Sequence, residues 1–410
     1  MENNIVKALI KKGVKIPNPE SVYISEDVNP DKISNEDVII YGGCKIMGER
    51  SLIMKNSQIG YEAPVTLENT LVGENCKLKG GFFKGAVFAG DNSFGSGAHV
   101  REGTIFEEQA NAAHTVGLKQ TILFPFVTLG SLINFCDCFM AGGTSRKDHS
   151  EIGSSFIHFN YTPNQDKATP SMMGDVPQGV MLKSKPIFLG GQGGLVGPVR
   201  IGYGCISAAG SIIRKNELRN DRIILGGSFK DVSIPRQFHV YKNVGHIFNN
   251  NIYYIAGLVS LKSWYKHIRP LFIYDDFSQS LIKGMQKNLD QCIIERIQRL
   301  KNFCEKLNLS KKIFLSKAKD KKSKLILIHE KAMDKFKLAD KIFKMEYENK
   351  GLDKEGETFI RVIEKKIAQS EDPTEKKYIQ VIQSLELKER EKGGQWLFNI
   401  EQEMVQKLLI

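Results

Sequence analysis

Residues 188–216 read FLGGQGGLVGPVRIGYGCISAAGSIIRKN, and this stretch decides the fold. Leu189, Leu195, Ile201, Ser207 and Ile213 follow one another at a strict spacing of six residues. A repeat this short predicts a solenoid of β-strands. Each six-residue unit supplies one flat face of a triangular prism, with its aliphatic residue inside and a small residue at the corner.

The same texture extends towards the N-terminus. Phe94, Val100 and Phe106 repeat the spacing of six, and aliphatic residues recur before glycine, as in Ile59-Gly60 and Leu129-Gly130. We therefore predict a mainly β chain in three parts. These parts are an N-terminal cap (1–35), a parallel β-helix of hexapeptide repeats (36–240) and an α-helical C-terminal domain (241–410).

Helical periodicity begins after the repeats end. Leu281, Met285, Leu289 and Ile293 recur at the spacing of one helix face. Residues 249–275 are rich in aromatic side chains, and we expect them to dock the helices on the prism. The helical segments predicted from periodicity are 278–307, 322–348, 357–369 and 373–387, with a last turn or two in 401–410.

Composition and charge restrict the class of protein. Hydrophobic residues make up 41% and charged residues 25% of the 410 residues, as in a globular protein. The chain contains no apolar run of about 18 residues and no apolar signal-peptide core, so we predict a cytoplasmic protein without a membrane span. The net charge is +12, and nearly all of the excess lies in 241–410. Solvated lysine-rich helices are the simpler interpretation, and nucleic acid remains an alternative partner.

The seven cysteines are irregularly spaced, which argues against a disulfide framework. Cys136 and Cys138 are the one close pair, and residues two apart on a strand point to the same side. No second pair completes a tetrahedral metal site, so we predict ordinary core residues and no metal.

Four segments carry a resemblance to a known family: VREGT (100–104), VGLKQTILFPF (116–126), LGSLINFCDC (129–138) and SEIGSSFIHFNYTPNQDK (150–167). With 188–216, they resemble the hexapeptide-repeat acyltransferases. The particular likeness, over about residues 60–216, is to the acetyltransferase domain of the bifunctional N-acetylglucosamine-1-phosphate uridyltransferase/glucosamine-1-phosphate acetyltransferase. The whole chain also resembles the UDP-N-acetylglucosamine pyrophosphorylase-like group.

This resemblance implies a left-handed coil, a homotrimer and a transferase of UDP-N-acetylglucosamine biosynthesis. The implied co-substrate is acetyl-CoA, and the implied acceptor is a sugar phosphate or sugar nucleotide. Arg101 and Lys119 match residues that hold the phosphate, a role suited to a guanidinium fork and an ammonium point charge. The residues matched to amino-sugar contacts are Asn160, Tyr161 and, more loosely, Lys167. Those matched to the acetyl-CoA groove are Ser154, Gly191 and Ala209.

The sequence departs from the family pattern in two respects. Only about 60 residues precede the match, without the glycine-rich nucleotide loop of the uridyltransferase domain, so we do not expect uridyl transfer by this chain. Ser131 stands where the family has its catalytic histidine, and Asn134 where it has a tyrosine. We keep both positions as substrate-binding candidates. A serine is no base at neutral pH, so acetyl transfer needs another one.

Three histidines are candidates for that base. His149 lies 18 residues after Ser131 and His114 lies 17 before it, and both stack on Ser131 if the coils stay in register. If residues 141–148 protrude as a loop, His149 leaves that face. His158 is the third candidate. Two suspected loops carry further charges, with Arg146 and Lys147 in the first and Lys183 and Lys185 in the second.

Three functions follow from these observations. The first is an acyltransferase acting on a sugar phosphate or sugar nucleotide. The second is a non-catalytic sugar-phosphate-binding or regulatory protein that lost its base at Ser131 and gained a basic helical interaction module. The third is a metal-dependent enzyme of the carbonic-anhydrase type, which would need His114, His149 and His158 to meet across a subunit interface.

Overall fold

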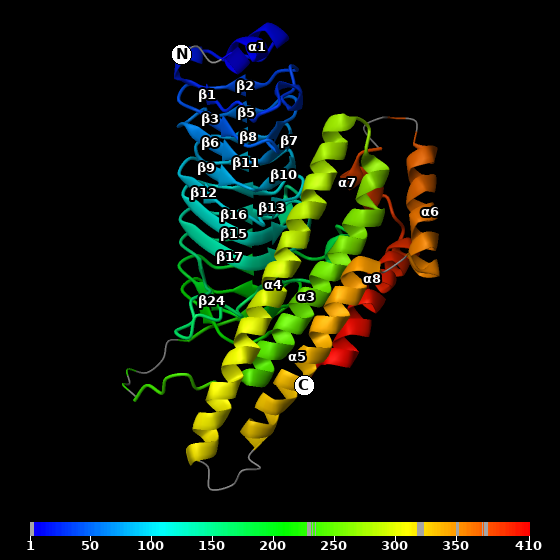
Figure 1. Ribbon diagram of the computed structural model, residues 1–410. Helices are drawn as coiled ribbons and strands as arrows, with labels where there is room; N and C mark the ends of the chain where they lie inside the picture. The colour runs from blue at the N-terminus through cyan, green and yellow to red at the C-terminus, as the bar shows by residue number, and fades with distance from the viewer. Residues whose placement is uncertain are drawn as a thin grey trace.

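The computed structural model describes residues 4–227, 231, 233, 235–317, 324–349, 352–370, 372 and 376–410. Its first half is a tall prism of parallel strands, and its second half is a layer of long helices along one side of that prism (Figure 1). The prism makes about 11 turns. The predicted left-handed β-helix followed by an α-helical region is therefore confirmed.

Each coil contributes one short strand to each of three faces. The first face contains β1 (Tyr23–Ile24), β3 (Lys45–Met47), β6 (Val65–Glu68), β9 (Gly81–Lys84), β12 (Ala98–Val100), the first halves of β15 (Val116–Leu123) and β17 (Ile133–Met140), β21 (Ile157–Phe159), β24 (Gly194–Val196) and β27 (Ile212–Ile213). The second face contains β4 (Leu52–Ile53), β7 (Leu71–Glu74), β10 (Val87–Gly90), β13 (Ile105–Phe106), the second halves of β15 and β17, β22 (Ser171–Met173) and β25 (Arg200–Ile201). The third face contains β2 (Ile39–Ile40), β5 (Gln58–Ile59), β8 (Lys77–Leu78), β11 (Ser93–Phe94), β14 (Asn111–Ala112), β16 (Thr128–Leu129), β20 (Glu151–Ile152), β23 (Phe188–Leu189), β26 (Ile206–Ser207) and β28 (Ile223–Ile224).

The N-terminal segment already belongs to this stack. Helix α1 (Asn4–Lys12) and the short turns η1 (Pro19–Ser21) and η2 (Pro30–Lys32) lie at one end of the prism. Tyr23 pairs with Lys45 and Ile24 with Ile46, so parallel pairing begins inside the segment predicted as a cap.

Burial separates the second face from the other two. On the first face β12 alternates, with His99 exposed between buried Ala98 and Val100. On the second face both residues of β13 and all four of β10 are buried. A strand that is buried on both sides has a continuous run of apolar residues in its sequence. In this protein the interior of the prism covers one side of the second face, and the helical region covers the other.

The helical region consists of six helices and one 3-10 turn among the described residues. They are α3 (Val244–His267), η3 (Arg269–Phe272), α4 (Asp276–Lys317), α5 (Lys324–Asn349), α6 (Lys354–Gln369), α7 (Tyr378–Gln383) and α8 (Leu387–Leu408). Helices α3 and α4 run along the second face, and α8 packs against α3 (Figure 1). None of the described helices combines the length and apolar composition needed to span a bilayer.

Helix α4 follows the prism coil by coil. A residue every four positions meets a later coil, because one helical turn rises about as far as the spacing between paired strands. The contacts are Gly284 against Leu71, the Asn288 amide to Gly85 O (2.8 Å), the Cys292 thiol to Gly103 O (3.1 Å) and the Arg296 guanidinium to Asp137 (2.8 Å).

Candidate functional site

The corner between the third and first faces brings five sequence-predicted residues into one column. His114, Ser131, Ser154, Gly191 and Ala209 each follow a paired third-face strand by two residues. Neighbouring members are joined by backbone hydrogen bonds of 2.8–3.1 Å. In each pair, the N–H of the residue directly after the second member donates to the carbonyl oxygen of the first member, as Leu132 N–H does to His114 O. We call this set the corner column. Its members after His114 are all small, so a strip of backbone lies open beside them.

Arg101 and Lys119 lie in adjacent coils, at the end of the first face away from the corner column. The Arg101 amide donates to Leu118 O over 2.9 Å, and Lys119 pairs in turn with Cys136. Burial raises the pKa of the Cys136 thiol to about 11, and neighbouring Asp137 adds to the rise, whereas a hydrogen bond from Arg101 opposes it. The two predicted phosphate-binding residues therefore lie side by side on adjacent coils of the first face.

Ser131, Asn134 and Cys136 trace the width of the first face. Asn134 is exposed, and its Oδ1 accepts a hydrogen bond from the Cys136 thiol over 3.3 Å. The five residue-to-residue steps from Ser131 to Cys136 extend over about 16 Å. The corner column and the basic pair therefore lie at the two edges of one face.

The predicted amino-sugar contacts lie in the loop after β21, at residues 160–169. Tyr161 is 76% exposed, and Lys167 is also exposed, with a left-handed backbone (φ 58° at Gln165 and 54° at Lys167). The Lys167 amide donates to Thr162 Oγ1 over 3.1 Å. The Asn160 amide is held differently, because its Nδ2 donates to Asp137 Oδ2 over 2.8 Å. The loop thus borders the same edge as Arg101 and Lys119.

Of the two alternatives for His149, the structure shows the one in which a protruding segment moves His149 off the face of Ser131. Residues 143–149 leave the coil as an antiparallel hairpin, β18 (Gly143–Ser145) and β19 (Asp148–His149). The coil resumes at β20, and Ser154 rather than His149 stacks on Ser131. His149 Nε2 lies 3.5 Å from Glu151 Oε2, and its Nδ1 is buried without a protein partner. Of the two stacking histidines, His114 alone keeps its place in the corner column.

Two of the four charges of the suspected loops, Arg146 and Lys185, are engaged elsewhere. Arg146 fastens the hairpin to the prism, since its Nη1 donates to Gln109 O, Phe126 O and Thr128 Oγ1 over 2.6–3.0 Å. In the second loop, which contains α2 (Val176–Gly179), Lys185 pairs with Asp221 at 2.8 Å. Lys147 and Lys183 are exposed.

His158 is a buried structural residue. Its Nδ1 lies 2.7 Å from Cys136 O and its Nε2 lies 2.8 Å from Ser171 Oγ, so both nitrogens are engaged. Burial lowers the pKa of His158 to about 4, and Arg296 adds to this effect, whereas Asp137 opposes it. A ring held in this way cannot reach a ligand on the first face. Within the described residues no three His, Cys, Asp or Glu side chains gather closely enough to hold a metal ion.

Two residues that sequence reasoning overlooked lie beneath the loop. Arg296 of α4 is 2% exposed, and its Nη2 lies 2.8 Å from Asp137 Oδ1. Asp137 is 5% exposed and holds Asn160 with its other oxygen. A signal was present, because Arg296 lies seven residues after Leu289 on the apolar stripe of its helix. A charge on that stripe predicts a buried partner. We call Asp137 and Arg296, with the half-buried Asn160 that Asp137 holds, the buried edge.

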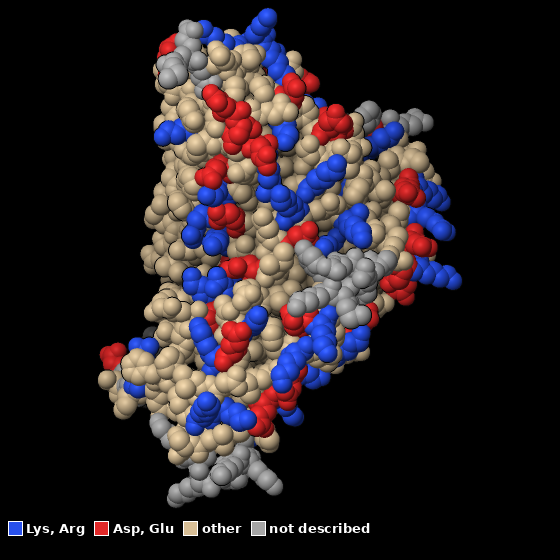
Figure 2. All heavy atoms as spheres, viewed as in Figure 1, with Lys and Arg blue, Asp and Glu red and all other residues tan. Residues whose placement is uncertain are grey.

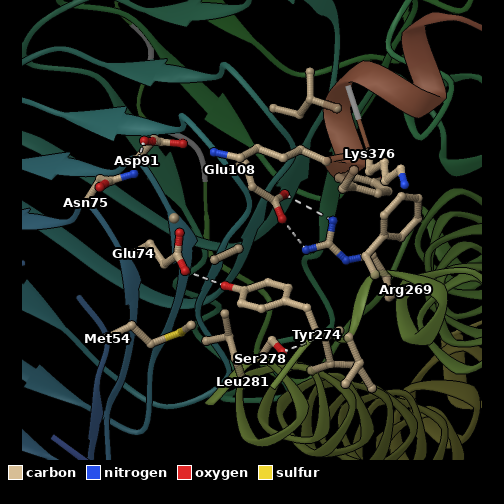
Figure 3. Close-up of a pocket in the computed structure, with 18 of the residues that line it drawn as sticks. Met54, Glu74, Asn75, Asp91, Glu108, Arg269, Tyr274, Ser278, Leu281 and Lys376 are labelled. Carbon is tan, nitrogen blue, oxygen red and sulfur yellow. Dashed lines mark hydrogen bonds and ion pairs between the residues drawn. The ribbon is translucent and has the colours of Figure 1, made fainter. Parts of the chain in front are cut away.

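A cavity of about 870 Å³ lies elsewhere, between the second face and the helices (Figure 3). Two pairs of its polar side chains are engaged with each other: Arg269 with Glu108, and Tyr274 with Glu74. None of the site residues predicted from the sequence lines it. On the side of the molecule shown in Figure 2, lysine and arginine are interleaved with aspartate and glutamate. That side of the surface therefore carries no single basic patch.

Comparison with known proteins gives relatives over about half of the chain. The chain is 28% identical over 212 residues to the bifunctional protein GlmU of Thermotoga maritima, covering 52% of this chain and 42% of that protein. It is 25% identical over 239 residues to the bifunctional protein GlmU of Nocardia farcinica, covering 58% and 43%. The chain thus spans less than half the length of these relatives. No family model matches the chain. Together with the β-helix, these relatives fit a hexapeptide-repeat acetyltransferase-like domain.

Proposed function

We propose that this protein is an acyltransferase that acts on the amino group of a sugar phosphate or sugar nucleotide in UDP-N-acetylglucosamine biosynthesis, with acetyl-CoA as donor. The observation that carries the proposal is the division of the first face. One edge offers an open strip of small residues, and the other offers Arg101 and Lys119 in adjacent coils. The acyl donor would lie along the corner column, the phosphate would bind at the basic pair, and the sugar would lie between them.

The chemistry needs a base that takes a proton from the attacking amine. An imidazole is the side chain suited to this task near neutral pH. His114 is exposed and precedes Ser131 by one coil. Within one chain it lies about 16 Å from the edge that holds Asn160, so we assign the role to His114 of a neighbouring copy, in a site between two copies of the homotrimer proposed below. Ser131, Asn134, Tyr161 and Lys167 would contact the acceptor.

We propose a homotrimer that acts in the cytoplasm. The helices occupy the second face, so the first and third faces remain for contacts between copies. Their later coils expose apolar side chains: Leu132 (53%), Ile157 (40%), Phe159 (40%), Val196 (37%) and Ile206 (47%). A solution mass of about three times 46.1 kDa is the expected result of light scattering on the purified protein.

A coupled thiol-release assay tests the activity. Purified protein receives acetyl-CoA with glucosamine 1-phosphate, and controls omit the sugar phosphate or replace it with glucose 1-phosphate. The proposal predicts thiol release that depends on the amino sugar. Release that is the same without the sugar phosphate would contradict it.

The second candidate function is a sugar-phosphate-binding protein without turnover. It is favoured by Ser131, because a hydroxyl occupies the column position where the family resemblance implies the base. Glucosamine 1-phosphate that raises the melting temperature without any thiol release would favour this function.

A further inference from the structure

The loop of residues 160–169 is fastened to the helical region at four points. The Tyr241 hydroxyl donates to Asp166 Oδ2 over 2.7 Å, and Asn251 of α3 donates to Ala168 O over 3.0 Å. Lys306 of α4 donates to Asn164 O. The fourth fastening is the pair of contacts by which Arg296 of α4 holds Asp137 and Asp137 holds Asn160. The helical region therefore holds the loop that carries the predicted sugar contacts.

The two contacts that link Arg296 to Asp137 and Asp137 to Asn160 determine which way the Asn160 side-chain amide points. Paired with Arg296, Asp137 is a carboxylate that can only accept hydrogen bonds. The Asn160 side chain must therefore turn its Nδ2 towards Asp137, as observed at 2.8 Å. Its Oδ1, an acceptor, is left for another partner, and no donor of the described residues bonds to it.

Stability alone is a weak reason for this arrangement. A buried ion pair contributes little net stability compared with apolar residues of the same size, because both charges lose their hydration. Arg296 also leaves its Nε and Nη1 buried without a protein acceptor. Such a group is costly, and it lies next to the candidate site rather than in the middle of a core.

We infer that the helical region positions the side chain of Asn160 in the sugar site. Arg296 acts through Asp137 to present Asn160 Oδ1 to a ligand group that donates a hydrogen bond, which an amino sugar supplies at its amine. Arg296 and Asp137 are positioning residues, and Asn160 makes the contact. This inference rests on the proposed function in assigning a sugar to the site.

The chain itself suggests the variant for a test. Asp137 has a left-handed backbone (φ 60°), and the same corner of earlier coils uses glycine, at Gly85 (φ 57°) and Gly103 (φ 75°). The double variant Asp137→Gly/Arg296→Met therefore removes both charges together without straining the corner. Gln120→Gly is the matched control, because Gln120 occupies the same corner one coil earlier (φ 54°) and does not contact Asn160.

Binding of glucosamine 1-phosphate and of 2-deoxyglucose 1-phosphate, which lacks the donor at that carbon, is measured by calorimetry. The wild-type protein and the Gln120→Gly variant should bind the amino sugar about tenfold more tightly than the deoxy sugar, as expected for one well-placed hydrogen bond. In the double variant this preference should fall below about threefold while the affinity for the deoxy sugar stays the same. Arg296→Lys, which keeps a charge for Asp137, should retain most of the preference.

Two results would overturn the inference: equal binding of both sugars by the wild-type protein, or an unchanged preference in the double variant. Failure of the sugar assignment on which the inference rests is recognised separately, because the wild-type protein would then bind neither sugar phosphate. In that case crystal structures of the wild-type protein and the double variant decide the matter. An Asn160 side chain in the same place in both structures would overturn the positioning role.

Discussion

The two edges of the first face differ in what builds them. The corner column belongs to the prism alone, and successive coils supply each member through backbone pairing. The buried edge needs both halves of the molecule, because Arg296 comes from α4 and Asp137 from β17. An edge made only of stacked coils offers a uniform row of backbone and small side chains. An edge made by two domains can orient one side chain, here Asn160, towards a particular ligand group. Substitutions should therefore have different consequences at the two edges.

The largest expected effect is on stability at the buried edge. Arg296→Met leaves Asp137 buried without its partner, and this should lower the free energy of unfolding by about 3–5 kcal/mol. Urea unfolding followed by circular dichroism measures it. The control is Arg299→Met on the same helix, whose partner Glu295 is half-exposed, with an expected loss of less than about 1 kcal/mol. Equal losses in both variants would contradict the claim that the pair of Arg296 and Asp137 behaves as a buried ion pair.

The buried edge should also be sensitive to acid through His158. The pKa of this residue is about 4 in the folded chain because of burial, against about 6.5 when exposed. The unfolded chain therefore binds a proton between these values while the folded chain does not. The contribution of His158 to stability is complete above about pH 6.5 and falls by about 3 kcal/mol as the pH drops to about 4. Unfolding of His158→Asn across this range should lose that part of the pH dependence, whereas His114→Asn should keep it.

At the corner column we expect a loss of catalysis without a loss of stability. His114→Gln should lower kcat by about 100-fold or more, because it removes the proposed base, and should change the KM for the sugar phosphate little. Steady-state thiol release measures both constants. His149→Gln, in the hairpin, should leave kcat unchanged, and the reverse outcome would move the base to the hairpin.

The smallest expected effect concerns the groove for the acyl donor. Ala209→Leu places a large side chain over the strip of backbone, and it should raise the KM for acetyl-CoA about tenfold with the affinity for the sugar phosphate unchanged. The matched control is Ile206→Leu, which keeps an apolar exposed residue on the third face nearby. An equal effect on both substrates would show that the two edges do not bind separate ligands.

The sequence predicted the parts of the molecule that repeat. A spacing of six determines which residues stack within an uninterrupted run, as for Leu189 on Ser207 and Leu195 on Ile213. The stacking of Ser131, Ser154, Gly191 and Ala209 was not predicted from the spacing, because insertions separate these residues. His149 was misplaced under the register hypothesis because residues 143–149 form a hairpin outside the coil. Whether an insertion protrudes from the coil depends on tertiary contacts such as those of Arg146. The spacing of residues in the sequence does not predict such contacts.

The helical region was predicted in outline and not in detail. Helix α3 was anticipated only as an aromatic-rich docking segment, because it is buried on nearly every side and so lacks an amphipathic pattern. Helix α8 begins at Leu387, well before the last turns predicted for 401–410, and it contains Gly393 and Gly394. Gly393 lies where a Cβ would meet the ring of Phe359 at 2.5 Å, so close packing explains a residue that usually argues against a helix.

The most direct test of the account is a crystal structure of the protein with coenzyme A and glucosamine 1-phosphate. We expect the pantetheine arm along Ser154, Gly191 and Ala209, the phosphate between Arg101 and Lys119, and the amine facing Asn160 Oδ1. Sugar phosphate bound in the cavity beside Glu108 and Arg269, or coenzyme A bound away from the corner column, would contradict the proposal that the first face is the active site.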